Sequence, residues 1–239
     1  YHDTENPAIL FSRVAAERPG FVCFFHKDVV KWCRKSYGSG YQSAAEKPAE
    51  MGTERGKRRM DEQELCKKAM ELGATGAGVI SLADVTPDPQ FRDLCALNYC
   101  GRYGKSWTCP PGCGSLDQCA ARLREYTRAV VVQLIHPLED SLDVDGMNEG
   151  QQAFDGLMRR IQAYAKLACP GALLLGAGSC TLCQTCTYPH APCRHPQLAI
   201  PSVESYGLDV QVLTAQAGLP CSWSEPKGYF CGLICVKEE

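Results

Sequence analysis

The stretch AVVVQLI, residues 129–135, is an apolar run interrupted only by Gln133. An apolar run of this length, rich in valine, is typical of a strand buried in the interior of a sheet. We therefore predict a buried strand here. The segments before and after it in the sequence indicate which elements cover it.

Amphipathic helices are predicted on both sides of this strand. Residues 61–74 (DEQELCKKAMELGA) carry acidic residues first, lysines later and Gly73 as a candidate C-cap, an order that the helix dipole favours. Residues 151–168 (QQAFDGLMRRIQAYAKLA) repeat apolar residues at helical spacing and stop at Cys169-Pro-Gly, as an amphipathic helix does. Residues 136–150 are predicted to form a polar loop before this second helix.

Elsewhere in the chain, predicted strands alternate with predicted helices. Further strands are predicted at 77–82, 172–178 and 229–236, and shorter helices at 87–97, at 115–129 and within 202–219. This order predicts a single α/β domain with a small mixed sheet flanked by helices and cysteine-rich loops at the ends of the elements.

The first part of the chain lacks such patterns. Residues 1–59 show no sustained helical or strand period and end in a short basic run, Arg55-Gly-Lys-Arg-Arg59. We therefore expect an N-terminal extension before a metal-binding domain of residues 60–239, with Met60 as the hypothetical natural start.

The composition restricts the class of protein. The chain of 239 residues is 45% hydrophobic and 22% charged with a formal net charge of -2, so bulk charge gives no indication of nucleic-acid binding. No apolar run reaches the ~18 residues of a membrane helix, and we expect a cytoplasmic protein without a membrane partner. Sixteen cysteines in a reducing compartment favour metal ligands over disulfides.

The densest cysteine motif is CTLCQTCTYPHAPC, residues 180–193. Three thiolates spaced by two residues, Cys180, Cys183 and Cys186, suit three corners of a 4Fe-4S cluster, and Cys193 is the candidate fourth ligand. Cys193 stays open to reassignment, because the fourth cysteine after such a triplet can ligate another cluster. Zinc is the alternative metal, although structural zinc usually takes two separated pairs. The neighbouring His190 and His195 are interpreted as surface groups or as groups that support the ligands.

A second cysteine block precedes it, CALNYCGRYGKSWTCPPGCGSLDQC, residues 95–119. Its spacings match no simple zinc finger and favour an irregular loop around a second cluster. Its five candidate ligands are Cys95, Cys100, Cys109, Cys113 and Cys119. Four ligands leave one cysteine spare, and Cys119 falls on the inward face of its helix, where a buried core cysteine is the competing interpretation.

Three functional classes remain open from these residues. They are a redox protein carrying one or two 4Fe-4S clusters, an iron-sulfur enzyme with an iron open to substrate, and a non-catalytic zinc or iron module. The partner would accordingly be a redox protein or a small molecule. The acidic residues between 139 and 145 lack the glycine and terminal glutamate of a calcium loop.

The two blocks together resemble a predicted metal-binding protein family of unknown function, found mainly in anaerobic bacteria and archaea. The similarity runs from Met60 to Val236 and also includes SVESYGLDV and the terminal YFCGLICV. It implies iron-sulfur or other metal binding by Cys95, Cys100 and Cys109 and by Cys180, Cys183, Cys186 and Cys193, and it implies no particular reaction. A fainter similarity is to cobalamin-dependent iron-sulfur reductases.

Overall fold

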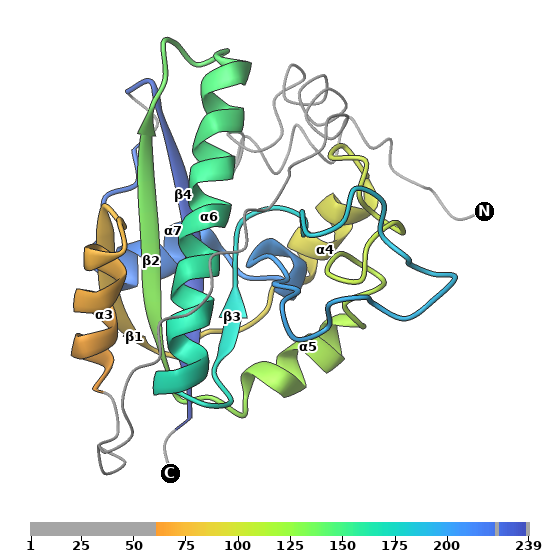
Figure 1. Cartoon of the computed structure of the whole chain (residues 1–239), viewed down its shortest axis with the longest axis horizontal. Coiled ribbons are helices and arrows are strands. Elements are labelled where there is room, and N and C mark those ends of the chain that lie inside the picture. The colour runs from red at the N-terminus through yellow and green to blue at the C-terminus, as the bar shows by residue number, and fades with distance from the viewer. Residues whose placement is uncertain (1–60, 223–224, 238–239) are drawn as a thin grey trace, which may run out of the picture.

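The computed structural model of the protein describes residues 61–222 and 225–237, and the expected N-terminal extension lies outside them. A four-stranded sheet forms the centre of the described chain, in the order β1-β2-β4-β3 (Figure 1). Its strands are β1 (Gly76–Ser81), β2 (Arg128–Pro137), β3 (Leu173–Leu175) and β4 (Lys227–Val236). The α/β class is confirmed, although every strand pair is antiparallel where we expected a mixed sheet.

The predicted buried strand lies within β2, between β1 and β4. Residues 129–132 have no exposed surface, because the sheet pairs them on both edges and helices cover both faces. Their side chains alternate between two separate apolar clusters, with Val130 and Val132 in one and Ala129 and Val131 in the other. This is the two-residue period of a strand.

Helices form a layer on each face of the sheet. The first layer consists of α3 (Glu62–Glu71) and α6 (Val144–Ala168), whose Leu65, Phe154 and Ile161 join the cluster of Val130 and Val132. The second layer consists of α5 (Leu116–Leu123), the 3-10 helix η2 (Glu204–Tyr206) and α7 (Val210–Gln216). A further helix, α4 (Pro89–Ala96), packs on η2.

The predicted polar loop at 136–150 is wrong in its second half, because α6 begins at Val144. Asp143 caps the helix by accepting a hydrogen bond of 2.8 Å from the Gly146 N–H. Glycines in this first part of the helix concealed its period, since glycine is a poor helix former. At Gly150 the packing requires glycine, because an added Cβ would lie 2.4 Å from a ring carbon of Phe230.

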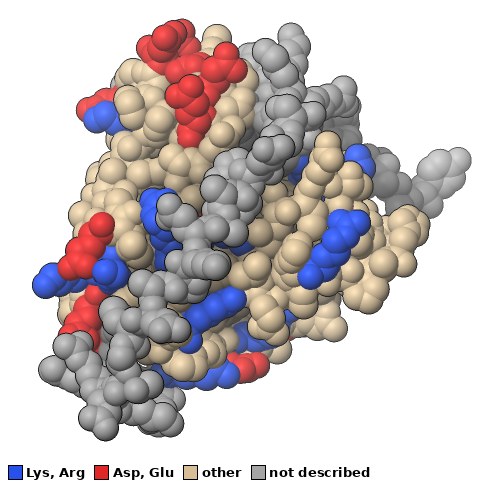
Figure 2. All heavy atoms as spheres, viewed as in Figure 1, with Lys and Arg blue, Asp and Glu red and all other residues tan. Residues whose placement is uncertain are grey.

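The two cysteine blocks meet at one end of the molecule. The loop between α4 and α5 lies beside the long segment that links β3 to η2 (Figure 1). Figure 2 shows Lys and Arg side chains spread over the visible face, this side included, and a group of acidic side chains at the tip where β2 leads into α6. Within residues 61–222 and 225–237, no helix is long and apolar enough to cross a membrane.

Candidate metal centre

The four cysteines of the second block line one hollow. Cys180, Cys183, Cys186 and Cys193 share its wall with residues 106–108 of the first block and with Arg194 and His195. All four cysteines are partly buried, whereas His190 and His195 are exposed. The hollow is therefore lined by four thiols and by one histidine, His195.

The loop that carries these cysteines is closed at its base. The Gly176 N–H donates to the Pro201 carbonyl at 2.8 Å, and the Val203 N–H donates to the Gly176 carbonyl at 2.9 Å. These bonds form an isolated parallel bridge between Gly176 and Ser202. The segment therefore leaves the sheet at the end of β3 and returns to the same place, so the sheet edge fixes where the cysteines lie.

Backbone N–H groups point at several of the sulfurs. The His195 N–H donates to Cys193 Sγ at 3.4 Å. Burial of Cys186 opposes ionisation, but hydrogen bonds with the backbone of Tyr188, Trp107 and Thr187 and with the Ser106 side chain together outweigh it and lower the pKa of the thiol. A lowered pKa favours the thiolate, which is the form that binds metal.

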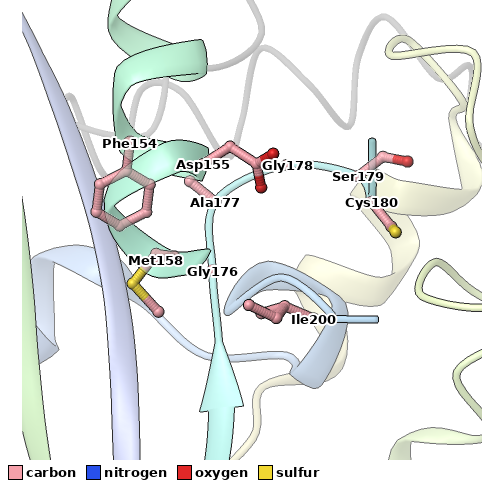
Figure 3. A pocket seen from close by; sticks show the side chains of 9 residues that line it. All are labelled: Phe154, Asp155, Met158, Gly176, Ala177, Gly178, Ser179, Cys180 and Ile200. Atoms are coloured by element: carbon pink, nitrogen blue, oxygen red, sulfur yellow. The ribbon is translucent and has the colours of Figure 1, made fainter. Parts of the chain in front are cut away.

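Helix α6 supports the same loop from the side. Figure 3 shows the Asp155 side chain pointing towards the loop near Gly178, whereas the Phe154 and Met158 side chains extend towards the sheet and away from Cys180. Asp155 accepts a hydrogen bond of 2.5 Å from the Thr181 hydroxyl, and Arg159 donates to the Leu198 carbonyl. Burial raises the pKa of the Cys180 thiol, while the Leu182 backbone and the Arg159 cation act against that rise.

Residues of the first block form part of the wall around the second. The Cys180 N–H donates to Thr108 Oγ1 at 3.2 Å. Trp107 Nε1 donates to the Ala191 carbonyl at 3.1 Å, and its ring meets that of Tyr188 edge-on at 4.9 Å. The sequence left open whether the two blocks meet, and the structure joins them.

Cys95, Cys100 and Cys109 lie near one another. Burial raises the pKa of Cys95 to about 12, and the charges of Glu204, Cys100 and Cys109 act in the same direction. Burial likewise raises the pKa of Cys109 to about 11, against a hydrogen bond with Ser179. Cys109 is buried, and Cys95 and Cys100 are partly buried. A bound cation would stabilise such neighbouring thiols as thiolates.

Glu204 lies in the same environment, and sequence reasoning missed it. Its Oε1 atom is buried and has no hydrogen-bond partner among the described residues, and burial raises the pKa of its carboxyl group against a hydrogen bond with Ser202. The 3-10 helix η2 places Glu204 against α4, which carries Cys95. In the sequence Glu204 is a single glutamate within SVESYGLDV, and nothing there distinguishes it from a glutamate on the surface.

Cys113 and Cys119 are placed differently from the other candidates. Both are buried and belong to the apolar cluster that also contains Leu123 and Tyr206. Arg92 and Arg122 donate hydrogen bonds to their sulfurs, and sequence reasoning assigned no role to either arginine. The structure therefore gives these two thiols partners of their own within the protein.

Three of the remaining cysteines lie in the apolar core. Cys231 and Cys235 of β4 are buried at 4% and 0% exposure, and Cys66 joins the apolar cluster beneath α3. Cys23 and Cys33 lie outside the described residues.

The donor set fits a thiophilic metal or cluster. Sulfur is the ligand of iron-sulfur clusters and of many zinc sites, and the four thiols around one hollow supply it. Among residues 61–222 and 225–237, no three His, Cys, Asp or Glu side chains already converge as a metal site.

Comparisons with known proteins agree with this donor set. No curated protein and no solved structure matched the chain. A family model described as predicted metal-binding protein (DUF2284) matches residues 78–235. This range includes both cysteine blocks and all four strands, apart from the first two residues of β1 and the last residue of β4. The chain therefore belongs to this family of predicted metal-binding proteins.

Proposed function

We propose that the protein is an iron-sulfur protein that holds a 4Fe-4S cluster on Cys180, Cys183, Cys186 and Cys193 and exchanges single electrons with a redox partner. The observation that carries the proposal is the placement of these four thiols around one hollow. A bound 4Fe-4S cluster supplies one-electron chemistry at a potential set by its surroundings.

The protein's own groups around the hollow suit a negatively charged, sulfur-ligated centre. The N–H groups of His195 and Tyr188 donate to ligand sulfurs, and Arg159 adds a positive charge near Cys180. Hydrogen bonds and positive charge at ligand sulfurs stabilise the more reduced, more negative state. Trp107 lines the hollow, and its ring meets that of Tyr188 edge-on.

Binding requires the four sulfurs to draw together from their present positions, since no three ligand side chains yet converge within the described residues. The loop closed at Gly176 and Ser202 permits this, because only side chains and the irregular backbone between these points need to move. The binding energy of a metal centre commonly contributes to ordering its own ligands.

A second candidate function follows from the first block. Cys95, Cys100 and Cys109 are three neighbouring thiols, of which Cys109 is buried and the other two are partly buried. The Cys119 thiol donates to the Cys113 carbonyl at 3.7 Å. A second cluster with three protein thiolates leaves one iron free to bind a small-molecule substrate, which makes the protein an enzyme. A non-catalytic zinc module is the third possibility for either set of thiols.

Anaerobic purification followed by iron, sulfide and zinc analysis tests the proposal. One 4Fe-4S cluster contributes about four irons and four sulfides per chain, with a paramagnetic signal after reduction, and two clusters double these values. Zinc without sulfide would overturn it. Cys186→Ser and Cys109→Ser, made separately, show how much iron and sulfide is lost when each cysteine block is disrupted. Cys221→Ser is the matched control, because Cys221 neither lines the hollow nor contacts either block.

A further inference from the structure

Glu204 has a carboxylate oxygen that lacks a partner. Its Oε1 atom is buried and forms no hydrogen bond within residues 61–222 and 225–237. The carboxyl group also interacts with the Ser202 side chain, whose Oγ atom accepts a hydrogen bond of 3.1 Å from the Ser205 N–H. Because a buried polar atom without a hydrogen bond is costly, Oε1 is suited to bind a group that is not part of the polypeptide.

Helix α4 places Cys95 beside Glu204. Arg92 of this helix donates to the Ser205 carbonyl at 2.7 Å, and a backbone hydrogen bond of 2.7 Å joins the residue before α4 to the residue after η2. Cys95 follows Arg92 by three residues, which puts the two side chains on the same face of the helix. The negative charge of Glu204 accordingly acts on the Cys95 thiol. These two groups therefore lie together on elements that are bonded to each other.

The base of the loop at 177–201 brings Cys109 to the same region. Ser179 and Glu204 follow the parallel bridge at this base by three and two residues, so they start from neighbouring points. The Ser179 side chain interacts with the Cys109 thiol. A hydrogen bond of 3.2 Å between the adjacent residues, Cys180 and Thr108, holds the two segments together. The thiol of Cys109 therefore lies on the side of the bridge from which Glu204 extends.

The other two thiols of the first block have contacts elsewhere. Arg92 Nη1 donates to Cys113 Sγ at 3.1 Å, and Arg122 Nη2 donates to Cys119 Sγ at 3.2 Å. The carboxylate within residues 95–119 belongs to Asp117, which is exposed on the first turn of α5. A fourth ligand for the remaining three thiols is therefore to be sought in another segment of the chain.

We propose that the Glu204 carboxylate is the fourth protein ligand of a 4Fe-4S cluster on Cys95, Cys100 and Cys109. The inference rests on the second candidate function, in which the first block holds a cluster, and it names the ligand of the iron that has no thiolate. Cys100 acts electrostatically on both Cys95 and Cys109, so the three thiols are mutual neighbours. Oε1 of Glu204 is the ligand atom.

Binding draws these four groups together. In the part of the chain that the structure describes, no three ligand side chains converge yet. Cys95 and Glu204 belong to α4 and η2, whereas Cys100 and Cys109 lie in the irregular segment between α4 and α5. Because this segment is irregular and the glutamate side chain is long and rotatable, the ligands can close on a cluster without disturbing the two helices.

An oxygen ligand gives one iron a distinct chemistry. Thiolates are the soft ligands that iron-sulfur clusters select, whereas carboxylates suit harder cations. The bond from Glu204 is therefore the weakest of the four protein bonds, and a small molecule with a stronger donor atom can displace it. The four-thiolate site on the second block offers no such position. The substrate of the first block is accordingly a small ligand that exchanges with a carboxylate on iron.

The test begins with carbon-13 on the parent protein. Anaerobic full-length protein is synthesised with glutamate labelled in its side-chain carboxyl group, reduced, and studied by electron-nuclear double resonance. We expect a carbon-13 coupling to the cluster signal, and no such coupling when aspartate is labelled instead. A glutamate with a purely structural role does not produce this coupling, so its absence from the glutamate-labelled protein overturns the proposal. This measurement needs no variant to fold.

Variants then assign the coupling and the metal to Glu204. Cys109→Ser defines the iron and sulfide that belong to the first block, and Glu204→Gln, which keeps the shape of the side chain, is expected to lose most of the same iron and the carbon-13 coupling. Glu125→Gln changes an exposed carboxylate paired with Lys237 and should retain both. A Glu204→Gln protein with the full iron content and the coupling of the parent overturns the proposal.

Cyanide serves as the probe of the exchangeable iron. We expect cyanide to shift the paramagnetic signal in the parent protein and in Cys186→Ser, and to have no effect in Cys109→Ser. A signal that is unchanged by cyanide in the parent protein contradicts the weak bond from Glu204.

This proposal and the cluster on the second block fail separately. Iron that is fully retained in Cys109→Ser but lost in Cys186→Ser supports the second-block cluster and overturns the role of Glu204. Iron that is lost in Cys109→Ser and in Glu204→Gln but retained in Cys186→Ser supports the role of Glu204 and overturns the second-block cluster.

Discussion

The Cys180 N–H donates a hydrogen bond of 3.2 Å to the Thr108 hydroxyl, and this bond joins the two cysteine blocks across 72 positions of sequence. Thr108 also contacts the Ser106 hydroxyl at 3.0 Å, so a small buried hydroxyl pair lies between the two sets of thiols. The relative position of the two blocks depends on these short polar contacts, since both segments are irregular loops.

Replacing Thr108 tests this junction. Thr108→Val keeps the shape of the side chain but leaves the partly buried Cys180 N–H without an acceptor, so we expect a loss of about 1–3 kcal/mol in the free energy of unfolding. Denaturant titration of the metal-free protein measures the loss. Thr108→Ser retains the hydroxyl and should lose clearly less, and equal losses in the two variants would show that the methyl packing matters more than the hydrogen bond.

Arg159 should control the reactivity of Cys180. Arg159→Gln removes a cation that favours the Cys180 thiolate, so the pKa of that thiol should rise further and its alkylation in metal-free protein should require a higher pH. The pH dependence of the alkylation rate, followed by peptide mass, measures the shift. Lys166→Gln on the same helix is the control, because Lys166 is exposed in the last turn of α6. An unchanged profile in Arg159→Gln would contradict the proposed charge effect.

Gly150 should tolerate substitution less than Gly156 of the same helix. A Cβ there would lie 2.4 Å from Phe230 Cε2 and 2.9 Å from His136 Cβ, so Gly150→Ala should destabilise the fold by about 1–3 kcal/mol through overpacking. At Gly156 the nearest atom is the flexible end of Arg160 at 3.6 Å, and Gly156→Ala should be neutral or stabilising by up to about 1 kcal/mol. Thermal unfolding of the two variants compares them directly, and the reverse order would contradict the packing.

Glu204 should make stability depend on pH. Burial raises the pKa of its carboxyl group in the folded protein above the value of 4.5 expected without burial. The unfolded chain therefore releases this proton first, and stability falls as the pH rises from about 4.5 towards the folded pKa. Glu204→Gln should remove this part of the decline in metal-free protein, whereas Glu125→Gln, an exposed carboxylate paired with Lys237, should not. Parallel pH profiles for the parent protein and Glu204→Gln would exclude the effect.

Local sequence patterns predict much of the fold. The run at 129–135 predicts a buried strand because it is almost continuously apolar and lacks the polar positions of an amphipathic helix. The observed strand lies in the interior of the sheet, between β1 and β4. The helical period predicts the helix at 151–168. Its true start at Val144 was hidden because Gly146 and Gly150 lower the local helix propensity, although Gly150 is required by its packing against Phe230. Tertiary contacts override propensity at such positions, and a single sequence does not reveal them.

The sequence by itself predicted sulfur as the donor atom of the candidate metal centre, because the number and spacing of the cysteines in the two blocks follow directly from residue identity. Only the tertiary structure decided which thiols are neighbours. The base of the 177–201 loop at the sheet edge, the contact of Thr108 with Cys180 and the two arginines at Cys113 and Cys119 all join residues from distant segments. Such contacts depend on how distant segments pack around β2 and the helices. The spacing of residues along the sequence therefore does not predict them.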